Sequence, residues 1–248
     1  MPPQANPDHI REALLAIGGT VVDDFKFPLP GDLKDLPKAA ALVSGTVEDR
    51  LPALLNRVRE RTWDEDGALL GYEFRRSTIG FPDILLVERA NPENVIFEIE
   101  AKSWYVLSGD ALTARFLTSR QAINDGTLVA IVAWVLDGVV AGHPKLLSIH
   151  IDDAQRLAEV RDAAWIAAEP PNTHRVVEPE NPPGTPPNQM RTTVEGQNLV
   201  NGVWRKNTDN FGKLDRLYDD DIRQFRDDVL GLRAGGLTFA QWRAFITG

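Results

Sequence analysis

Apolar residues in the N-terminal part of the chain recur at intervals of three and four, the spacing of one face of a helix. The clearest stripe, at i, i+3, i+4 and i+7, consists of Leu51, Leu54, Leu55 and Val58. Asp49 is a good N-cap for that helix, because Pro52 then lies in the first turn, where its missing N–H costs little. Three helices are therefore predicted: Asp8–Ile17, Leu36–Val43 and one that begins at Asp49.

Beyond a turn signal at residues 64–67, the pattern changes to short apolar runs that are typical of strands. The predicted elements are, in order, strands over Leu69–Arg75, Asp83–Val87 and Val95–Ala101, a helix over Asp110–Asn124, strands over Thr127–Leu136 and Leu146–Ile151, and a helix from Asp152 or Asp153 to about Ala167. This order favours an α/β fold in which a mixed central β-sheet is flanked by helices.

The chain changes character after this core. Seven prolines fall between Pro170 and Pro187 and predict a long exposed loop. Helical patterns return over Leu214–Leu232 and Thr238–Ile246. We therefore divide the chain into a core with N-terminal helices (1–168), a proline-rich linker (169–190) and a C-terminal helical extension (191–248) that is either separate or part of the same domain.

Composition narrows the function classes. The chain has no cysteine, which excludes disulfides and thiolate metal sites. No signal-peptide pattern is present at the start, and the longest apolar run, Thr127–Leu136, is too short to cross a bilayer. A soluble cytoplasmic protein with no membrane partner is expected. The net charge of −9 argues against a nucleic-acid partner unless basic residues gather on one face.

The residues with the clearest chemical potential lie on two neighbouring predicted strands. In a strand, alternate side chains share a face, so Glu100 and Lys102 point the same way, while Ile99 and Ala101 point to the apolar side. Asp83 begins the preceding strand, and the short turn between the strands makes them antiparallel neighbours. The two carboxylates and the ammonium are thus expected to converge at one end of the sheet.

Such a group suits phosphodiester hydrolysis. Mg²⁺ prefers one or two carboxylates together with waters and substrate phosphate. It polarises the phosphoryl oxygen and lowers the pKa of a bound water. A lysine beside it can orient or deprotonate the attacking water and offset the charge of the phosphate.

Pro82-Asp83, followed by Glu100-Ala101-Lys102, resembles the two half-motifs of the PD-(D/E)xK nuclease superfamily. The resemblance covers about residues 69–151 in pattern and only these few residues in identity. It implies a restriction-endonuclease-like core with added C-terminal helices. It also implies that Asp83 and Glu100 are ligands of Mg²⁺, for which Mn²⁺ can substitute, and that Lys102 lies near the nucleophile. The Ala101 carbonyl is a further candidate ligand.

The activity that the resemblance implies is hydrolysis of phosphodiester bonds in DNA, with double-stranded DNA as the expected partner. The size of the chain fits a sequence-specific type II restriction endonuclease, and a homodimer is expected if both strands of a symmetric site are cut. Three alternatives stay open: a structural ion pair between Glu100 and Lys102, a catalytically inactive module that binds DNA or protein, and a nuclease for RNA or for branched or single-stranded DNA.

Other residues are candidates for supporting roles. Glu98 shares the strand face of Glu100 and is either a second acidic ligand or a solvated strand residue. Glu48 is either an acidic residue contributed by the preceding helix or a carboxylate favoured by the helix dipole. Gln121 is a candidate to line the site. Basic residues that are candidates for DNA contacts are Arg75, Arg76, Arg115, Arg120, Arg205 and Lys206.

Overall fold

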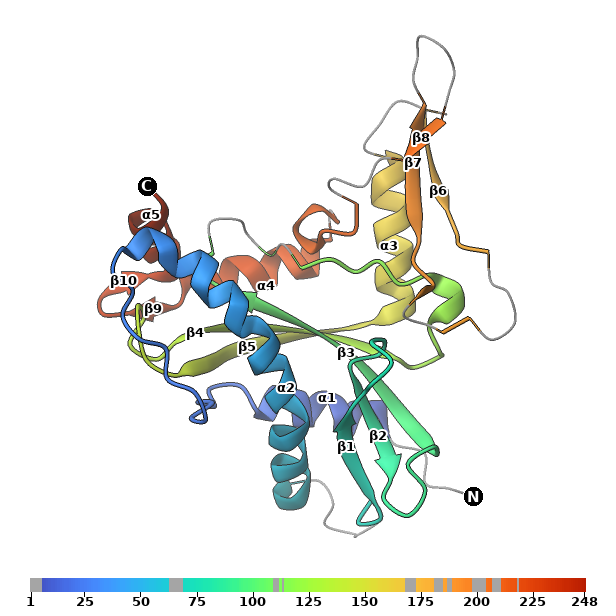
Figure 1. Ribbon diagram of the computed structural model, residues 1–248, viewed down its shortest axis with the longest axis horizontal. Helices are drawn as coiled ribbons and strands as arrows, with labels where there is room; N and C mark the ends of the chain where they lie inside the picture. The colour runs from blue at the N-terminus through green and yellow to red at the C-terminus, as the bar shows by residue number, and fades with distance from the viewer. Residues whose placement is uncertain are drawn as a thin grey trace.

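A five-stranded mixed sheet lies at the centre of the computed structural model, which describes residues 6–62, 69–108, 112, 114–167, 173–180, 185–186, 189–197, 204–206, 211–217 and 219–248 (Figure 1). The strands follow chain order. They are β1 (Tyr72–Arg76), β2 (Ile84–Glu88), β3 (Val95–Tyr105), β4 (Leu128–Leu136) and β5 (Pro144–Asp153). Strands β1, β2 and β3 form an antiparallel meander, β4 is parallel to β3, and β5 is antiparallel to β4. The predicted α/β class with a mixed central sheet is therefore confirmed.

Strand β4 is the centre of the hydrophobic core. All nine of its residues are buried, which explains its continuous run of Val, Ile, Ala and Trp. A strand covered on both faces has no solvent side on which to place polar residues. The alternation in β3 is also as expected, since Phe97, Ile99 and Ala101 are all buried.

Two N-terminal helices, α1 (Pro7–Ala16) and α2 (Leu36–Thr62), pack beside the sheet, with the short 3₁₀ helix η1 (Leu33–Asp35) between them. The prediction of separate helices over 36–43 and from 49 was wrong, because α2 is continuous with Pro52 inside it. Asp49 is consequently not an N-cap and instead forms an ion pair with Arg76. Pro52 has no N–H to bond the carbonyl four residues earlier, and Figure 1 shows α2 bending part-way along its length.

The predicted helix over Asp110–Asn124 was also wrong. Residues 109–111 and 113 lie outside the described residues, and residues 114–119 are not helical; only Arg120–Ala122 form a 3₁₀ turn, η2. The backbone of this segment bonds to distant chain instead, since the Phe116 N–H donates to the Gly212 carbonyl at 2.8 Å. Its helically spaced apolar residues are buried by tertiary packing: Leu112, Phe116 and Ile123.

The C-terminal part is more than a linker and helices. Helix α3 (Ala154–Ala167) begins at Asp153, whose side chain accepts from the N–H of Arg156 at 2.8 Å. A three-stranded antiparallel sheet then follows, made of β6 (His174–Val177), β7 (Thr193–Gln197) and β8 (Trp204–Lys206), and it projects beside α3 (Figure 1). Strand β6 falls inside the expected linker because its four residues contain no proline.

The predicted helix over Leu214–Leu232 is divided into a 3₁₀ turn, η4 (Leu214–Arg216), and α4 (Asp220–Gly231). A short hairpin, β9 (Arg233–Ala234) with β10 (Leu237–Thr238), leads to α5 (Phe239–Thr247), which has the capping box Thr238–Gln241. Apolar residues of α4 and α5 belong to the same buried cluster as the central sheet. No helix within the described ranges has the length and apolar character needed to span a bilayer.

Helix α4 is attached to the sheet by an aromatic contact and a charged network. The ring of Phe225 lies 6.1 Å from that of Trp104 and 5.4 Å from that of His150. Asp219 caps α4 by accepting from the N–H of Ile222 at 3.0 Å, and its carboxylate also pairs with Arg156 at 2.7 Å. Asp219 is 7% exposed, so its carboxylate is largely shielded from water.

We predict that Asp219→Ala lowers the free energy of unfolding by roughly 2 kcal/mol, because it removes a helix cap and a hydrogen bond to a charged group. Urea unfolding followed by circular dichroism measures this change. The matched control is Asp220→Ala, which removes the neighbouring carboxylate. That side chain is 96% exposed, so the control is expected to unfold like the parent protein. Equal losses in both variants would contradict the prediction.

Candidate active site

Strand β3 continues beyond the end of β2, and this mismatch creates the candidate site. The last residue pair between the two strands is Ile84 with Ile99, whereas β3 runs on to Tyr105. The backbone N–H groups that β3 presents on this side therefore have no strand to bond. Asp83 accepts from the N–H of Ala101 at 2.9 Å, and Glu48 accepts from that of Ser103 at 3.0 Å.

Two carboxylates are thereby fixed along the free edge of β3. Asp83 comes from the turn immediately before β2, and Glu48 comes from α2, in front of the proline inside that helix. Unbonded backbone N–H groups in a partly buried strand are costly, so each carboxylate has a structural reason for its position. Of the two readings of Glu48, the structure thus favours a helix residue that reaches the site.

The side chains of β3 itself complete the group. Glu100 and Lys102 share one face of the strand, and the Lys102 ammonium donates to the Glu100 carboxylate. Its Nζ atom also lies 3.3 Å from the Ala101 carbonyl oxygen and 3.8 Å from Asp83 Oδ2. The three residues of the expected centre therefore lie in one cluster, with the Ala101 carbonyl among them.

The cluster is electrostatically unusual. Glu100 is 5% exposed, and burial raises its pKa to about 8, although the Lys102 charge lowers it; the nearby Asp83 adds to the increase. Burial alone would lower the pKa of Lys102, but Glu100, Asp83 and Glu48 outweigh that effect and raise it. Strongly perturbed carboxyl and amino groups in one place are a feature of functional sites.

These groups open onto a cavity of about 330 Å³. Its lining also includes Arg115, from the loop between β3 and β4, and Arg191, from the segment before β7. Arg115 was a predicted DNA contact. Arg191 lies in the stretch Gln189–Lys206, from which base-reading residues were expected, but it was not named itself, because nothing in its local sequence distinguishes it from other arginines. The residues that line the cavity are Gly80, Phe81, Asp83, Glu100, Lys102, Arg115, Leu117, Thr118 and Arg191.

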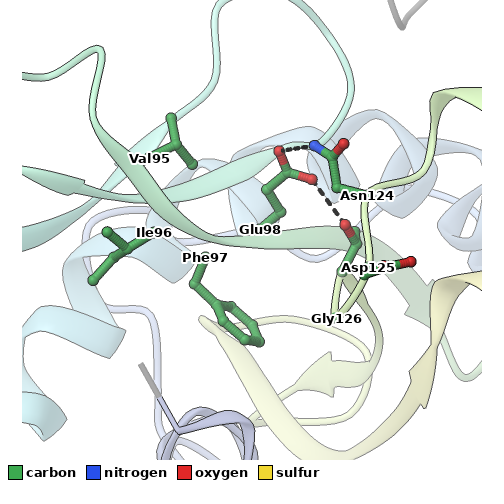
Figure 2. A pocket seen from close by; sticks show the side chains of 8 residues that line it. Val95, Ile96, Phe97, Glu98, Asn124, Asp125 and Gly126 are labelled. Atoms are coloured by element: carbon green, nitrogen blue, oxygen red, sulfur yellow. Dashed lines mark hydrogen bonds between the residues drawn. The ribbon is translucent and has the colours of Figure 1, made fainter. Parts of the chain in front are cut away.

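Two other candidates lie outside this cavity. Glu98 accepts from Asn124 Nδ2 at 2.7 Å and from Thr127 Oγ1 at 2.8 Å, and it faces a separate pocket of about 180 Å³ (Figure 2). This arrangement favours the reading of Glu98 as a strand residue away from the centre. Gln121 lines a third pocket, beside α3 and β6, together with Arg120.

Most of the other basic candidates have carboxylate partners. Arg75 bonds to Glu73, and Arg120 pairs with Glu159 at 2.6 Å. Arg76 pairs with Asp49, as described above. None of these three lines the cavity. Arg205 and Lys206 lie on β8, and their side chains are outside the described residues.

The oxygen atoms of the cluster fit a hard divalent cation. Glu100 Oε2 is buried and has no hydrogen-bond donor among the described residues. Within the same residues, no three His, Asp or Glu side chains form a metal-binding group. A cation here would therefore rely on Asp83, Glu100, the Ala101 carbonyl and ligands from solvent or substrate, which is the kind of incomplete protein shell that Mg²⁺ accepts.

No protein-family model, curated protein or solved structure matches the chain. The likeness to the PD-(D/E)xK superfamily therefore depends on the two half-motifs and on the arrangement of their residues.

The raised pKa of Glu100 gives a pH-dependent stability. Folded Glu100 keeps its proton up to about pH 8, whereas the unfolded residue loses it near its ordinary value of 4.5. The folded state thus binds more protons in this window, and the free energy of unfolding is expected to fall as pH rises, by at most about 1.4 kcal/mol per pH unit.

Urea unfolding in EDTA at several pH values between 5 and 8 tests this expectation. Glu100→Gln removes the titrating group and should flatten the dependence relative to the parent protein. Parallel curves for the two proteins would show that Glu100 ionises normally and would contradict the assignment.

Proposed function

We propose that the protein is a metal-dependent endonuclease that hydrolyses phosphodiester bonds in DNA. The proposal rests on the convergence of Asp83, Glu100, the Ala101 carbonyl and Lys102 at one cavity that Arg115 and Arg191 also line. Carboxylates alone would repel a phosphate. The lysine and the arginines make the cavity suitable for an anionic substrate next to a cation.

In this proposal, Asp83, Glu100 and the Ala101 carbonyl hold Mg²⁺ or Mn²⁺. When bound, the ion polarises the phosphoryl oxygen and generates a nucleophilic hydroxide from water. The hydrogen bond from the Ala101 N–H fixes one oxygen of Asp83 and leaves the other for ligation. Lys102 is an ammonium at neutral pH, because the neighbouring acidic groups outweigh the effect of burial on its pKa, and it donates to the attacking water or to a phosphate oxygen.

The proposal extends to a restriction-endonuclease-like core. The support is the order of elements: α2 precedes the meander β1–β2–β3, and the next strand, β4, is parallel to β3. A sequence-specific enzyme of a restriction system, acting as a homodimer on double-stranded DNA, is the form of the proposal that the chain length favours. The net charge of −9 is compatible with it because arginines gather locally at the cavity.

Digestion of plasmid and phage DNA, unmethylated and methylated, in Mg²⁺ or Mn²⁺ tests the activity. We predict that the parent protein cuts and that Lys102→Ala reduces the rate by at least about a hundredfold, since removal of one preorganised charge from such a site costs that much. The matched control is Glu98→Gln, a change on the same strand face but outside the cavity, which should leave cleavage intact.

Discrete fragments would establish sequence specificity. Cleavage by both the parent and Lys102→Ala would locate the activity elsewhere and would overturn the assignment. If the parent cuts none of these DNAs, the catalytically inactive module, or a nuclease for RNA or for branched or single-stranded DNA, replaces the proposal.

A further inference from the structure

The arginine-bearing wall of the cavity is built from two segments that are distant in sequence. Thr118 and Arg191 form an isolated antiparallel bridge. On either side of it, the Ser119 N–H donates to the Met190 carbonyl at 2.8 Å, and the Thr192 N–H donates to the Leu117 carbonyl at 2.9 Å. The backbone at Arg191 is therefore held against the loop that carries Arg115.

A buried arginine also binds both segments of this bridge. Arg161 on α3 is 1% exposed and donates to the Thr118 carbonyl at 2.8 Å and to Thr192 Oγ1 at 3.0 Å, thus binding both segments at once. Its charge is paired with Asp162 at 2.7 Å, and its guanidinium lies over the ring of Phe211 at 5.1 Å. These contacts fix the two segments to each other before any substrate arrives, and such preorganisation reduces the entropic cost of binding.

Arg191 differs from most of the other surface arginines. Its side chain is exposed and lines the cavity, and no carboxylate within the described part of the chain forms an ion pair with it. By contrast, Arg175 lies on β6, the strand that pairs with β7, and its charge is neutralised by Glu195. An uncompensated guanidinium that lines the same cavity as two carboxylates and an ammonium can meet an anion there, and guanidinium matches phosphate geometry.

We propose that Arg191 binds a backbone phosphate of a nucleic-acid strand that lies in the cavity, so that the C-terminal part of the chain completes the substrate site. The identity of the ligand rests on the proposed function, whereas the anion-binding role of the wall does not require hydrolysis. Arg161 is a positioning residue in this scheme, because it holds the wall without reaching the cavity.

Binding of a fluorescein-labelled DNA duplex, measured by fluorescence anisotropy in EDTA between 50 and 200 mM KCl, tests the proposal without cleavage. Arg191→Ala is expected to weaken binding about tenfold, as for loss of a charged hydrogen bond. The slope of log K against log salt should become shallower by about 0.9, the value for one phosphate contact. Arg191→Lys should keep the slope and lose only part of the affinity.

The matched control is Arg175→Ala, which changes the net charge by the same amount but lies outside the cavity. It should bind DNA like the parent protein, and thermal unfolding should be unchanged in Arg191→Ala because that side chain is exposed. An unchanged affinity and slope in Arg191→Ala, an equal loss in Arg175→Ala, or no DNA binding by the parent would each overturn the proposal. If Arg191→Ala loses binding while the parent cuts no DNA, the nuclease proposal fails and the phosphate-binding wall stands.

Discussion

The candidate site depends on the unequal lengths of two neighbouring strands. Because β3 extends past β2, the N–H groups of Ala101 and Ser103 need acceptors from outside the sheet, and Asp83 and Glu48 supply them. A requirement of backbone hydrogen bonding thus places two carboxylates along the strand that carries Glu100 and Lys102. The same bonds that satisfy the strand edge bring Asp83 close enough to add to the raised pKa of Glu100, and Glu48 close enough to help raise the pKa of Lys102. The N–H groups of β3 that have no strand partner therefore explain both the positions of the two carboxylates and the chemistry proposed for the site.

The electrostatic cost of this arrangement is concentrated at Glu100. Its carboxyl is buried with one oxygen lacking a donor among the described residues, and Lys102 offsets the burial only in part, since the pKa of Glu100 remains raised. When Glu100 is ionised and no metal ion is bound, the buried carboxylate is stabilised, within the described residues, only by Lys102. A divalent ion would satisfy both carboxylates, and the lysine would then be free to face the substrate. Such local frustration is common where function takes precedence over stability.

Periodicity predicted the strands and the side-chain faces because these follow from local geometry: the alternation along β3 correctly separated Glu100 and Lys102 from Ile99 and Ala101. Periodicity failed where backbone hydrogen bonds to distant segments replaced the local hydrogen bonds of a helix. The segment around Phe116 has helical spacing but bonds to residues near 190 and 212, and Pro52 is accommodated inside a helix. The position of Arg191 at the cavity could not be predicted from periodicity, because tertiary bonds to residues 117–119 bring it there.

If the cluster at the start of β2 and in the middle of β3 is a divalent-metal centre, anomalous diffraction from crystals soaked in Mn²⁺ should locate the ion there. We expect a manganese peak within about 2.5 Å of oxygen atoms from Asp83 and Glu100 and near the Ala101 carbonyl, with the Lys102 ammonium displaced from Glu100. A peak bound elsewhere, or an empty site in which Lys102 still pairs with Glu100 at saturating Mn²⁺, would contradict this assignment.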